Sequence, residues 1–200
     1  MNLPRKDPQT IIKTVIDYSF TIFCLILLTP VILILAVAIK ISGKGPVIYS
    51  QKRIGRFGRS FNLYKFRSMH FGTEEDLPLL SGKTDKRITA VGRFMRKHKF
   101  DEIPNFINVL KGEMSLVGPR PEQQYFIDQI LLKAPQYKLL QNIKPGITSW
   151  GQVKYGYASN VNEMIERLEF DLFYLENRSL WFDLKVAFYT IGIIFKGEGI

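Results

Sequence analysis

The sequence predicts an α+β fold that is mainly helical and carries one membrane-inserted helix. Residues 18–39 form an uncharged apolar run of 22 residues, about 33 Å long as a helix and therefore long enough to cross a bilayer. Two short β-type runs around a glycine-containing turn predict a small hairpin rather than a large sheet. Several later stretches have the apolar spacing of amphipathic helices. We expect the membrane segment in residues 1–42 and a cytoplasmic domain in residues 43–200.

The apolar run contains a helix-breaking pair near its middle, Thr29 and Pro30. Proline removes the hydrogen bond to the carbonyl of Ile26, and the Thr29 hydroxyl can bend the helix by bonding to the carbonyl of Leu25. Basic residues flank both ends of the run, and such residues favour the cytoplasmic side. A re-entrant helix, broken at Thr29-Pro30 and entering and leaving by the same face, satisfies both observations. A spanning helix with a tolerated proline kink is the alternative.

The hairpin is expected next, from strands at residues 46–51 and 60–66 with Gly55 and Gly58 in the turn. Residues 71–86 are polar and contain glycine and proline, which predicts a loop. A basic helix follows at residues 88–99.

A second helix is predicted at residues 102–111, because four apolar side chains recur there at helical spacing: Ile103, Phe106, Ile107 and Leu110. Asp101 is the expected N-cap, with Pro104 in the first turn, where its missing donor costs nothing. Gly112 is the expected terminator.

The last third of the chain predicts three helical stretches and one loop. Residues 122–140 are expected to be helical with a break near Pro135, and residues 144–157 form a loop rich in glycine and aromatic residues. Residues 160–175 are a capped helix. Residues 180–195 predict an amphipathic helix lying on the membrane surface, one of several interfacial helices, or alternatively an ordinary helix facing the core.

Composition indicates an anionic partner. The net charge is +10, which suits nucleic acid, anionic lipid headgroups, or nucleotide and polyprenyl phosphates. Residues 40–67 contain eight basic residues and no acidic one. Their position next to a membrane segment favours a cytoplasmic membrane surface. The single cysteine, Cys24, allows no disulfide within the chain, and the two histidines, His70 and His98, exclude a histidine-rich metal site.

Two nucleotide-binding motifs are incomplete. Gly82-Lys83-Thr84 resembles the end of a P-loop, but the upstream glycine that this motif requires falls at Leu77. The segment from Gly55 to Gly58 lacks the third glycine of a dinucleotide-binding motif.

The most informative stretch is residues 114–122, where Arg120 stands between Pro119 and Pro121. Two prolines stiffen this loop, and a stiffly held guanidinium suits recognition of a phosphate. Twelve residues earlier lies the adjacent pair Asp101-Glu102. Adjacent carboxylates are expected to face different sides of a helix start. The basic residues that could neutralise a nearby diphosphate are Lys65, Arg67, Arg96 and Arg120. Taken alone, these features also fit a solvated turn and an ordinary helix cap.

Several ordered blocks resemble the bacterial sugar transferases, the small monotopic phosphoglycosyl transferases. They are residues 65–69 (KFRSM), 101–105 (DEIPN), 108–115 (NVLKGEMS), 118–121 (GPRP), 144–148 (KPGIT), 150–153 (WGQV) and 177–185 (NRSLWFDLK). The resemblance covers nearly the whole chain. Ser149 departs from it, because the family has a second glycine there, which leaves the shape of that loop in doubt.

The resemblance implies a function and a topology. Asp101 would be the catalytic nucleophile that attacks a UDP-sugar and expels UMP. Glu102 would be catalytic through bound Mg²⁺, and polyprenyl (undecaprenyl) phosphate would accept the phosphosugar from the aspartyl intermediate. This is the first membrane step of polysaccharide or glycan assembly. Family members with a Ser/Thr-Pro break are re-entrant, which implies a monotopic protein whose catalytic domain, residues 43–200, lies on the cytoplasmic face of the bacterial inner membrane, in contact with membrane lipid and without nucleic acid. The sugar, pathway, polyprenol length and oligomeric state stay open.

Two rival functions also fit parts of the sequence. A membrane-tethered binding protein for anionic lipid or nucleic acid explains the basic charge but not the carboxylate pair or the stiff arginine loop. A hydrolase acting on the same diphosphate would turn over without lipid.

Overall fold

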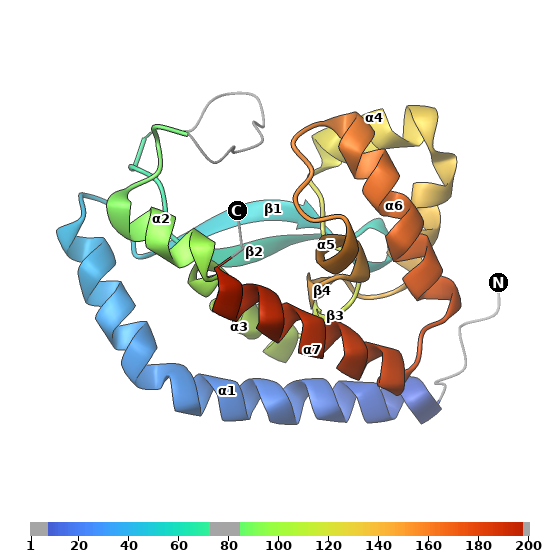
Figure 1. Cartoon of the computed structure of the whole chain (residues 1–200), viewed down its shortest axis with the longest axis horizontal. Helices are drawn as coiled ribbons and strands as arrows, with labels where there is room; N and C mark the ends of the chain where they lie inside the picture. Colours follow the sequence, from blue (N-terminus) through green and yellow to red (C-terminus); the bar gives the residue numbers. More distant parts are fainter. Residues whose placement is uncertain (1–7, 73–84, 198–200) are drawn as a thin grey trace.

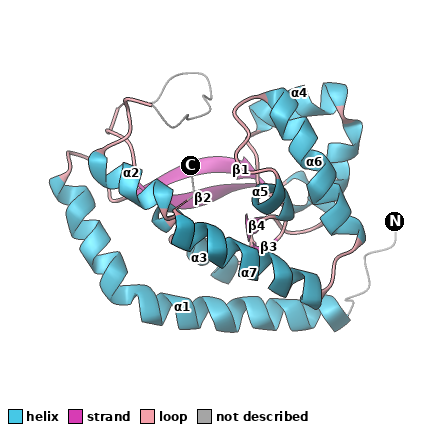
Figure 2. Ribbon diagram, in the orientation of Figure 1, coloured by secondary structure: helices cyan, strands magenta, loops and turns pink. Residues whose placement is uncertain are grey.

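The computed structural model describes residues 8–72 and 85–197 of the chain. Most of the described residues are helical, and the strands form two small two-stranded sheets (Figure 2). Helix α1, Pro8–Ile41, runs along one side of the molecule, and the remaining elements lie to one side of it (Figure 1). Helices α4, Gln124–Lys133, and α6, Val161–Glu176, lie toward one end, and α2, Ala90–Lys97, lies toward the other. The predicted α+β, mainly helical class with a small hairpin is confirmed.

Helix α1, Pro8–Ile41, begins ten residues before the predicted apolar run. It continues through Pro30, its only internal proline, and its ribbon bends sharply part-way along (Figure 1). The Thr29 hydroxyl donates to the carbonyl of Leu25 at 2.8 Å, as expected. The predicted break is therefore a bend in one helix, because a proline removes one main-chain hydrogen bond while the flanking turns keep theirs.

The predicted hairpin is confirmed as β1, Ile48–Ile54, paired antiparallel with β2, Ser60–Phe66. A short 3₁₀ turn, Arg56–Gly58, connects the strands, and Gly58 has a φ of +71°. Strand β1 extends three residues past the predicted end, because Lys52, Arg53 and Ile54 pair fully with β2. The predicted loop at residues 71–86, with the rejected P-loop segment in it, lies mainly outside the described residues; a bridge between Met69 and Ile88 closes its base.

The predicted basic helix is α2, Ala90–Lys97, whose N-cap Thr89 accepts from the Gly92 amide. Gly92 allows a close approach, because a β-carbon there would lie 1.9 Å from the carbonyl oxygen of Ser68. The next predicted helix is shorter than expected: a 3₁₀ turn, Phe100–Glu102, precedes α3, Asn105–Leu110.

The prediction that Asp101 caps this helix is wrong, because Pro104 occupies the N-cap position and no side chain caps it. Pro104 has no amide hydrogen to continue an α-helical ladder from the 3₁₀ turn, so the α-helix starts only after it. Gly112, with a φ of +76°, follows the helix end as predicted.

The predicted helix at residues 122–140 is divided at Pro135, as expected, into α4, Gln124–Lys133, and a 3₁₀ segment, Pro135–Asn142. The loop predicted at residues 144–157 is wrong in part. It contains β4, Gly146–Thr148, which pairs in parallel with β3, Ser115–Val117, and helix α5, Trp150–Lys154. Ser149, the departure from the family pattern, is the N-cap of α5 and accepts from the Gln152 amide.

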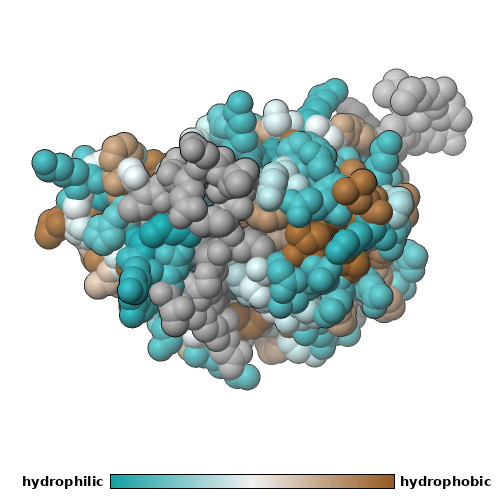
Figure 3. Space-filling model, turned by 90° about the horizontal axis from the view of Figure 1, so that it is seen from above, coloured by the Kyte–Doolittle hydropathy of each residue, from teal (hydrophilic) through white to brown (hydrophobic). Residues whose placement is uncertain are grey.

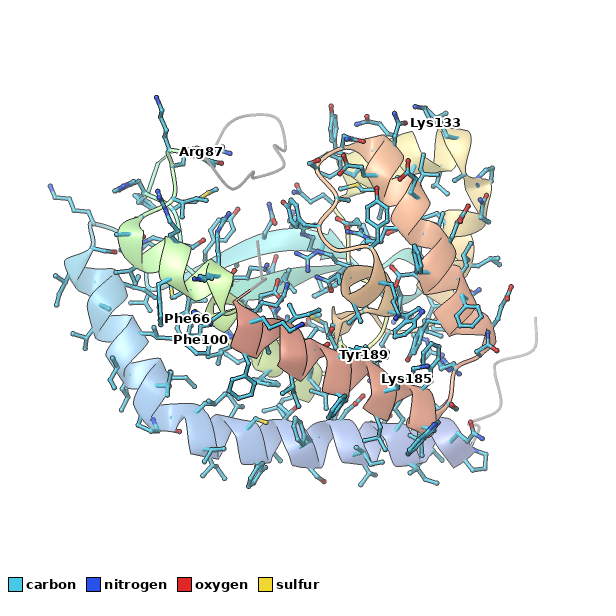
Figure 4. All side chains as sticks on the ribbon, in the orientation of Figure 1. Phe66, Arg87, Phe100, Lys133, Lys185 and Tyr189 are labelled. Carbon is cyan, nitrogen blue, oxygen red and sulfur yellow. The ribbon has the colours of Figure 1, made fainter. Side chains whose placement is uncertain are left out.

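The chain ends in two capped helices, α6, Val161–Glu176, and α7, Leu180–Lys196, with Asn160 and Ser179 as N-caps. One core cluster joins α4, the 3₁₀ segment after it and α6. Another joins the end of α1 to β2 and α2 through Leu35, Ile39, Phe66, Met95 and Ile103. Phe100 packs against this second cluster, close to Phe66 (Figure 4).

Large apolar side chains are exposed on α1, α3 and α7. On α7 they recur along one face: Trp181, Leu184, Phe188, Ile191 and Phe195. Helix α1 is long and apolar enough to cross a membrane, with a mean hydropathy of 3.1 over its best window, of which 11% is buried. The face of the molecule away from α1 is mainly hydrophilic, with scattered apolar residues (Figure 3).

Candidate active site

The carboxylate pair lies in the 3₁₀ turn between α2 and α3, and both side chains are buried, with Asp101 7% and Glu102 8% exposed. Lys99, in the left-handed region with a φ of 56°, follows the C-cap of α2 and is the N-cap of this turn. The Glu102 amide then bonds to the Lys99 carbonyl, and the Ile103 amide bonds to the Phe100 carbonyl. The turn therefore fixes the backbone of both acids.

Two cations from distant parts of the chain meet this pair. Lys65, on β2, places its Nζ 2.7 Å from Glu102 Oε1 and 3.9 Å from Asp101 Oδ2. Arg120, on the proline-rich loop, places its Nη1 3.4 Å from Glu102 Oε1. The two carboxylates were expected to face different sides, but the long lysine side chain reaches both. Four predicted site residues therefore form one cluster.

The two acids have different electrostatic environments. Burial raises the pKa of Asp101, and the negative charge of Glu102 adds to this, while Lys65 opposes it. Burial alone would also raise the pKa of Glu102, but the charges of Lys65 and Arg120 hold that pKa well below its usual range. Glu102 is thus a fixed anion between two cations, whereas Asp101 is a more basic carboxylate with a looser contact.

Arg96 lies near this cluster, and Arg67 is bound elsewhere. The Arg96 Nε donates to the Ser68 hydroxyl at 2.9 Å, and the Arg96 charge lowers the pKa of Asp101. Buried Arg67 instead donates to three main-chain carbonyls that follow or end α1, those of Ile39, Gly43 and Lys44. Among the described residues it has no ion pair with the acids. Its contacts are those of a C-terminal cap for α1, and its predicted phosphate role stays a prediction.

Magnesium fits the donor chemistry next to the pair. Mg²⁺ prefers hard oxygen ligands, and a site often supplies one or two carboxylates while substrate phosphates and water complete the shell. Asp101 and Glu102 are such carboxylates. Asn105, the first residue of α3, is buried, and its Oδ1 has no partner within residues 8–72 and 85–197. In the same ranges no group of three or more histidine, cysteine or acidic side chains is clustered, so the fit concerns a metal shared with substrate.

A second buried cluster was missed by the sequence reasoning. Glu122, directly after the Pro-Arg-Pro run, is 2% exposed and pairs with both Arg53 and Arg167. The sequence holds a signal for it, since Glu122 is the last residue of the proline-rich stretch 114–122. Its partners on β1 and α6 could not be inferred, because 69 and 45 residues separate them from it.

Comparison with known proteins gives the family. A family model described as bacterial sugar transferase matches residues 8–197. The chain belongs to the bacterial sugar transferase family. This confirms the resemblance seen in the sequence blocks, and it places the buried carboxylate pair in a segment that the family model covers.

Three similar proteins have names that state a reaction. A UDP-N-acetylgalactosamine-undecaprenyl-phosphate N-acetylgalactosaminephosphotransferase of Aeromonas hydrophila is 42% identical over 94% of this chain. A UDP-glucose:undecaprenyl-phosphate glucose-1-phosphate transferase of Escherichia coli is 38% identical over 97% of it. An undecaprenyl-phosphate galactose phosphotransferase of Salmonella typhimurium is 36% identical over 99% of it. The chain spans 44%, 42% and 43%, respectively, of the lengths of these relatives.

Proposed function

We propose that this protein transfers a phosphosugar from a UDP-sugar to polyprenyl phosphate and releases UMP. The observation that carries the proposal is the buried Asp101-Glu102 pair held against Lys65 and Arg120 in a member of the bacterial sugar transferase family. The names of three relatives with different sugars, all transferring to undecaprenyl phosphate, support the reaction class.

The proposed reaction has two displacements at one phosphorus atom. An oxygen of the Asp101 carboxylate attacks the β-phosphorus of the UDP-sugar, and the bond from that phosphorus to the bridging oxygen breaks, so UMP leaves with the electron pair. A phosphate oxygen of the polyprenyl phosphate then attacks the same phosphorus and expels the Asp101 carboxylate. The product is a polyprenyl diphosphosugar, and Asp101 is regenerated.

The environment of each side chain suits its role. The raised pKa of Asp101 makes its carboxylate more basic and hence more nucleophilic once it is ionised. Lys65, Arg96 and Arg120 supply positive charge for the diphosphate and for the leaving UMP. Glu102 would hold Mg²⁺ together with substrate phosphates, and the metal would offset the negative charge that accumulates on the diphosphate.

We also propose that α1 is re-entrant. Lys13, near its start, pairs with Asp183 of α7 at 2.6 Å, and buried Asp17 accepts from Ser115 of β3 at 2.6 Å. Its other end is held by Arg67. Both ends are therefore bound to the same domain, which favours a helix that bends within the bilayer and returns to the cytoplasmic face. The exposed apolar faces of α3 and α7 would rest at the membrane surface of the bacterial inner membrane.

The rival functions account for less of the structure. A basic binding protein would leave the buried acid pair and its two cations without a role, although burying these charges carries a desolvation cost. A hydrolase would use water as the second nucleophile, and its turnover would not require polyprenyl phosphate.

The test begins without lipid. The purified protein, in detergent with Mg²⁺, is incubated with a panel of UDP-sugars, and UMP release and intact mass are measured. We expect release of at most about one UMP per protein and a mass increase of one phosphosugar that maps to Asp101. Adding undecaprenyl phosphate should start steady turnover with ping-pong kinetics.

Matched variants separate the two acids. Asp101→Asn should lose the adduct and nearly all turnover, because an amide is a poor nucleophile. Glu102→Gln should keep the nucleophile but lose turnover, with partial recovery at higher Mg²⁺. Asp128→Asn, an exposed change on α4, should behave as wild type. Sequential kinetics with no adduct would overturn the aspartyl intermediate, and salt-sensitive lipid binding without UMP release would favour the binding protein.

A further inference from the structure

The buried ion cluster behind the Pro-Arg-Pro loop has Glu122 at its centre. Its Oε2 lies 3.1 Å from Arg53 Nη1 on β1, and its Oε1 lies 2.7 Å from Arg167 Nη2 on α6. Both arginines are themselves largely buried, with 13% and 7% of their side chains exposed. One carboxylate therefore joins three parts of the fold in a region with little water.

The same cluster fixes the backbone of the loop that carries Arg120. Arg53 also donates to the Pro121 carbonyl at 3.2 Å, and the Ile54 amide donates to the Glu122 carbonyl at 2.9 Å. The Arg53 guanidinium is held in turn by Gln51 Oε1, at 2.7 and 3.1 Å. The residue after Arg120 and the one after that are thus bonded to strand β1. The other end of the loop is bonded as well, since the Gly146 amide donates to the Pro119 carbonyl at 2.9 Å.

The charges of two carboxylates, Glu102 and Glu122, act on Arg120. The charges of Glu102 and Glu122 both raise its pKa, although burial alone would lower it, while its hydrogen bond goes to Glu102. The Glu122 carboxylate itself forms ion pairs with Arg53 and Arg167. Glu122 therefore acts on Arg120 through the loop and through its field, without a hydrogen bond that would compete for the guanidinium.

We infer that Glu122 is a positioning residue for Arg120. Together with Arg53, Glu122 holds the loop so that the Arg120 guanidinium faces the diphosphate of the nucleotide sugar. This inference rests on the proposed function, because it needs a diphosphate at Arg120. Glu122 itself touches no substrate. Its effect is on the angle and place at which the loop presents the guanidinium, and a misplacement of about 1 Å costs up to about 100-fold in rate.

A purely structural role for Glu122 predicts a different result. Removing one carboxylate from between two buried arginines leaves uncompensated charge, so Glu122→Gln must destabilise the fold under either interpretation. Stability alone is therefore no test. The deciding quantity is whether the loss in donor binding and turnover depends on Arg120.

The experiment is a double-mutant cycle on the full-length protein in detergent. Wild type, Glu122→Gln, Arg120→Lys and the double variant are compared by calorimetric binding of UDP-sugar with Mg²⁺ and by kcat/KM for the donor. We expect Glu122→Gln to lower kcat/KM about 10- to 100-fold in the wild-type background. In the Arg120→Lys background the same change should lower kcat/KM less than about twofold, because the guanidinium that Glu122 positions is already absent.

Two further variants and a control complete the test. Glu122→Asp retains the charge on a shorter side chain and should recover part of the loss. If Glu122→Gln does not fold, Arg53→Lys takes its place in the cycle, since lysine keeps the charge but lacks the planar fork with which Arg53 bonds Gln51, the Pro121 carbonyl and Glu122. Glu169→Gln, an exposed change on the helix that carries Arg167, is the control and should match wild type.

Each outcome of the cycle decides whether Glu122 positions Arg120. Additive losses across the cycle, or a Glu122→Gln variant with lowered Tm but unchanged donor binding and kcat/KM, overturn the positioning role. If wild type binds UDP-sugar but releases no UMP, the proposed reaction fails and the binding cycle still decides the inference. If wild type binds no UDP-sugar, both fail together.

Discussion

Asp171 is a buried acid outside the catalytic pair, on α6 beneath the start of α5. Its Oδ1 accepts from the Gly151 amide at 2.9 Å. Burial raises the pKa of Asp171 to about 6, although the charge of Arg167 and hydrogen bonds from Gly151 and Ser149 lower it in part. This acid therefore couples folding to pH in the mildly acidic range.

The sign of this coupling follows from proton binding. The folded pKa of about 6 lies above the reference value of 3.8, so between these values the folded protein binds more protons than the unfolded chain. Stability from this group is greatest below pH 3.8 and falls as pH rises to about 6, by roughly 3 kcal/mol in total. Asp171→Asn removes the titration and keeps the oxygen that accepts from Gly151. We expect Tm to fall less between pH 4.5 and 6.5 in this variant than in wild type.

The measurement is a thermal melt in detergent across that pH range. Glu169→Gln, two residues away and exposed, should keep the wild-type slope. A wild-type slope in Asp171→Asn would show that other groups set the pH dependence.

For single residues, the sequence patterns predicted which side chains carry chemistry better than they predicted which partners those side chains contact. The stiff flanks of Arg120 and the acid pair were visible, and the structure brings these residues to Lys65. Arg67 has the same charge and stands two residues after Lys65, yet it turns to the end of α1. Arg67 directly follows the last residue of β2, and the alternation of the strand does not fix which partner a long cationic side chain reaches.

Helices and strands with long periodic patterns were predictable, and short ones were not. The hairpin, α2, α6 and α7 were found, because each carries either alternation or a capped apolar period. Strand β4 has three residues, beginning with a glycine, and exists through its parallel pairing with β3. Helix α5 has five residues, too few for a period of 3.6 to be visible.

The bend of α1 leads to a prediction about topology. In a Cys24→Ser background, single cysteines at Asn2 and Lys44 should both resist a membrane-impermeant thiol reagent in intact cells and both react after permeabilisation. Pro30→Leu restores a main-chain hydrogen bond and should straighten the helix. In that variant a fraction of the Asn2→Cys protein should become labelled in intact cells. Labelling of Asn2→Cys without the Pro30 change would mean that α1 spans the bilayer.

The contacts that hold the start of α1 join the two ends of the chain. Lys13 and Asp183 are 170 residues apart, and Asp183 also accepts from the Tyr174 hydroxyl at 2.5 Å. Such pairs are set by the complete fold, and no local pattern contains them. This is why the sequence predicted a membrane helix but not what binds it.

Asp183→Asn should loosen this attachment, because the amide cannot match the charged bond with Lys13. In lipid nanodiscs, amide hydrogens in the first helical turns of α1 should exchange about 10-fold faster than in wild type, with the rest of the protein little changed. Asp128→Asn, at an exposed position of α4, should leave exchange unchanged. Unchanged exchange in Asp183→Asn would mean that packing, and not the ion pair, holds the helix.

The large sequence separation of this ion pair also bears on biosynthesis. The chain is made from its first residue onward, and Arg67, which binds the end of α1, follows Ile39 by only 28 residues. Asp183 emerges from the ribosome much later. Helix α1 therefore meets the bilayer while its second half can already be held and its first half has no partner. The depth and direction of α1 in the lipid can therefore be set during synthesis, before the contacts of the complete domain fix them.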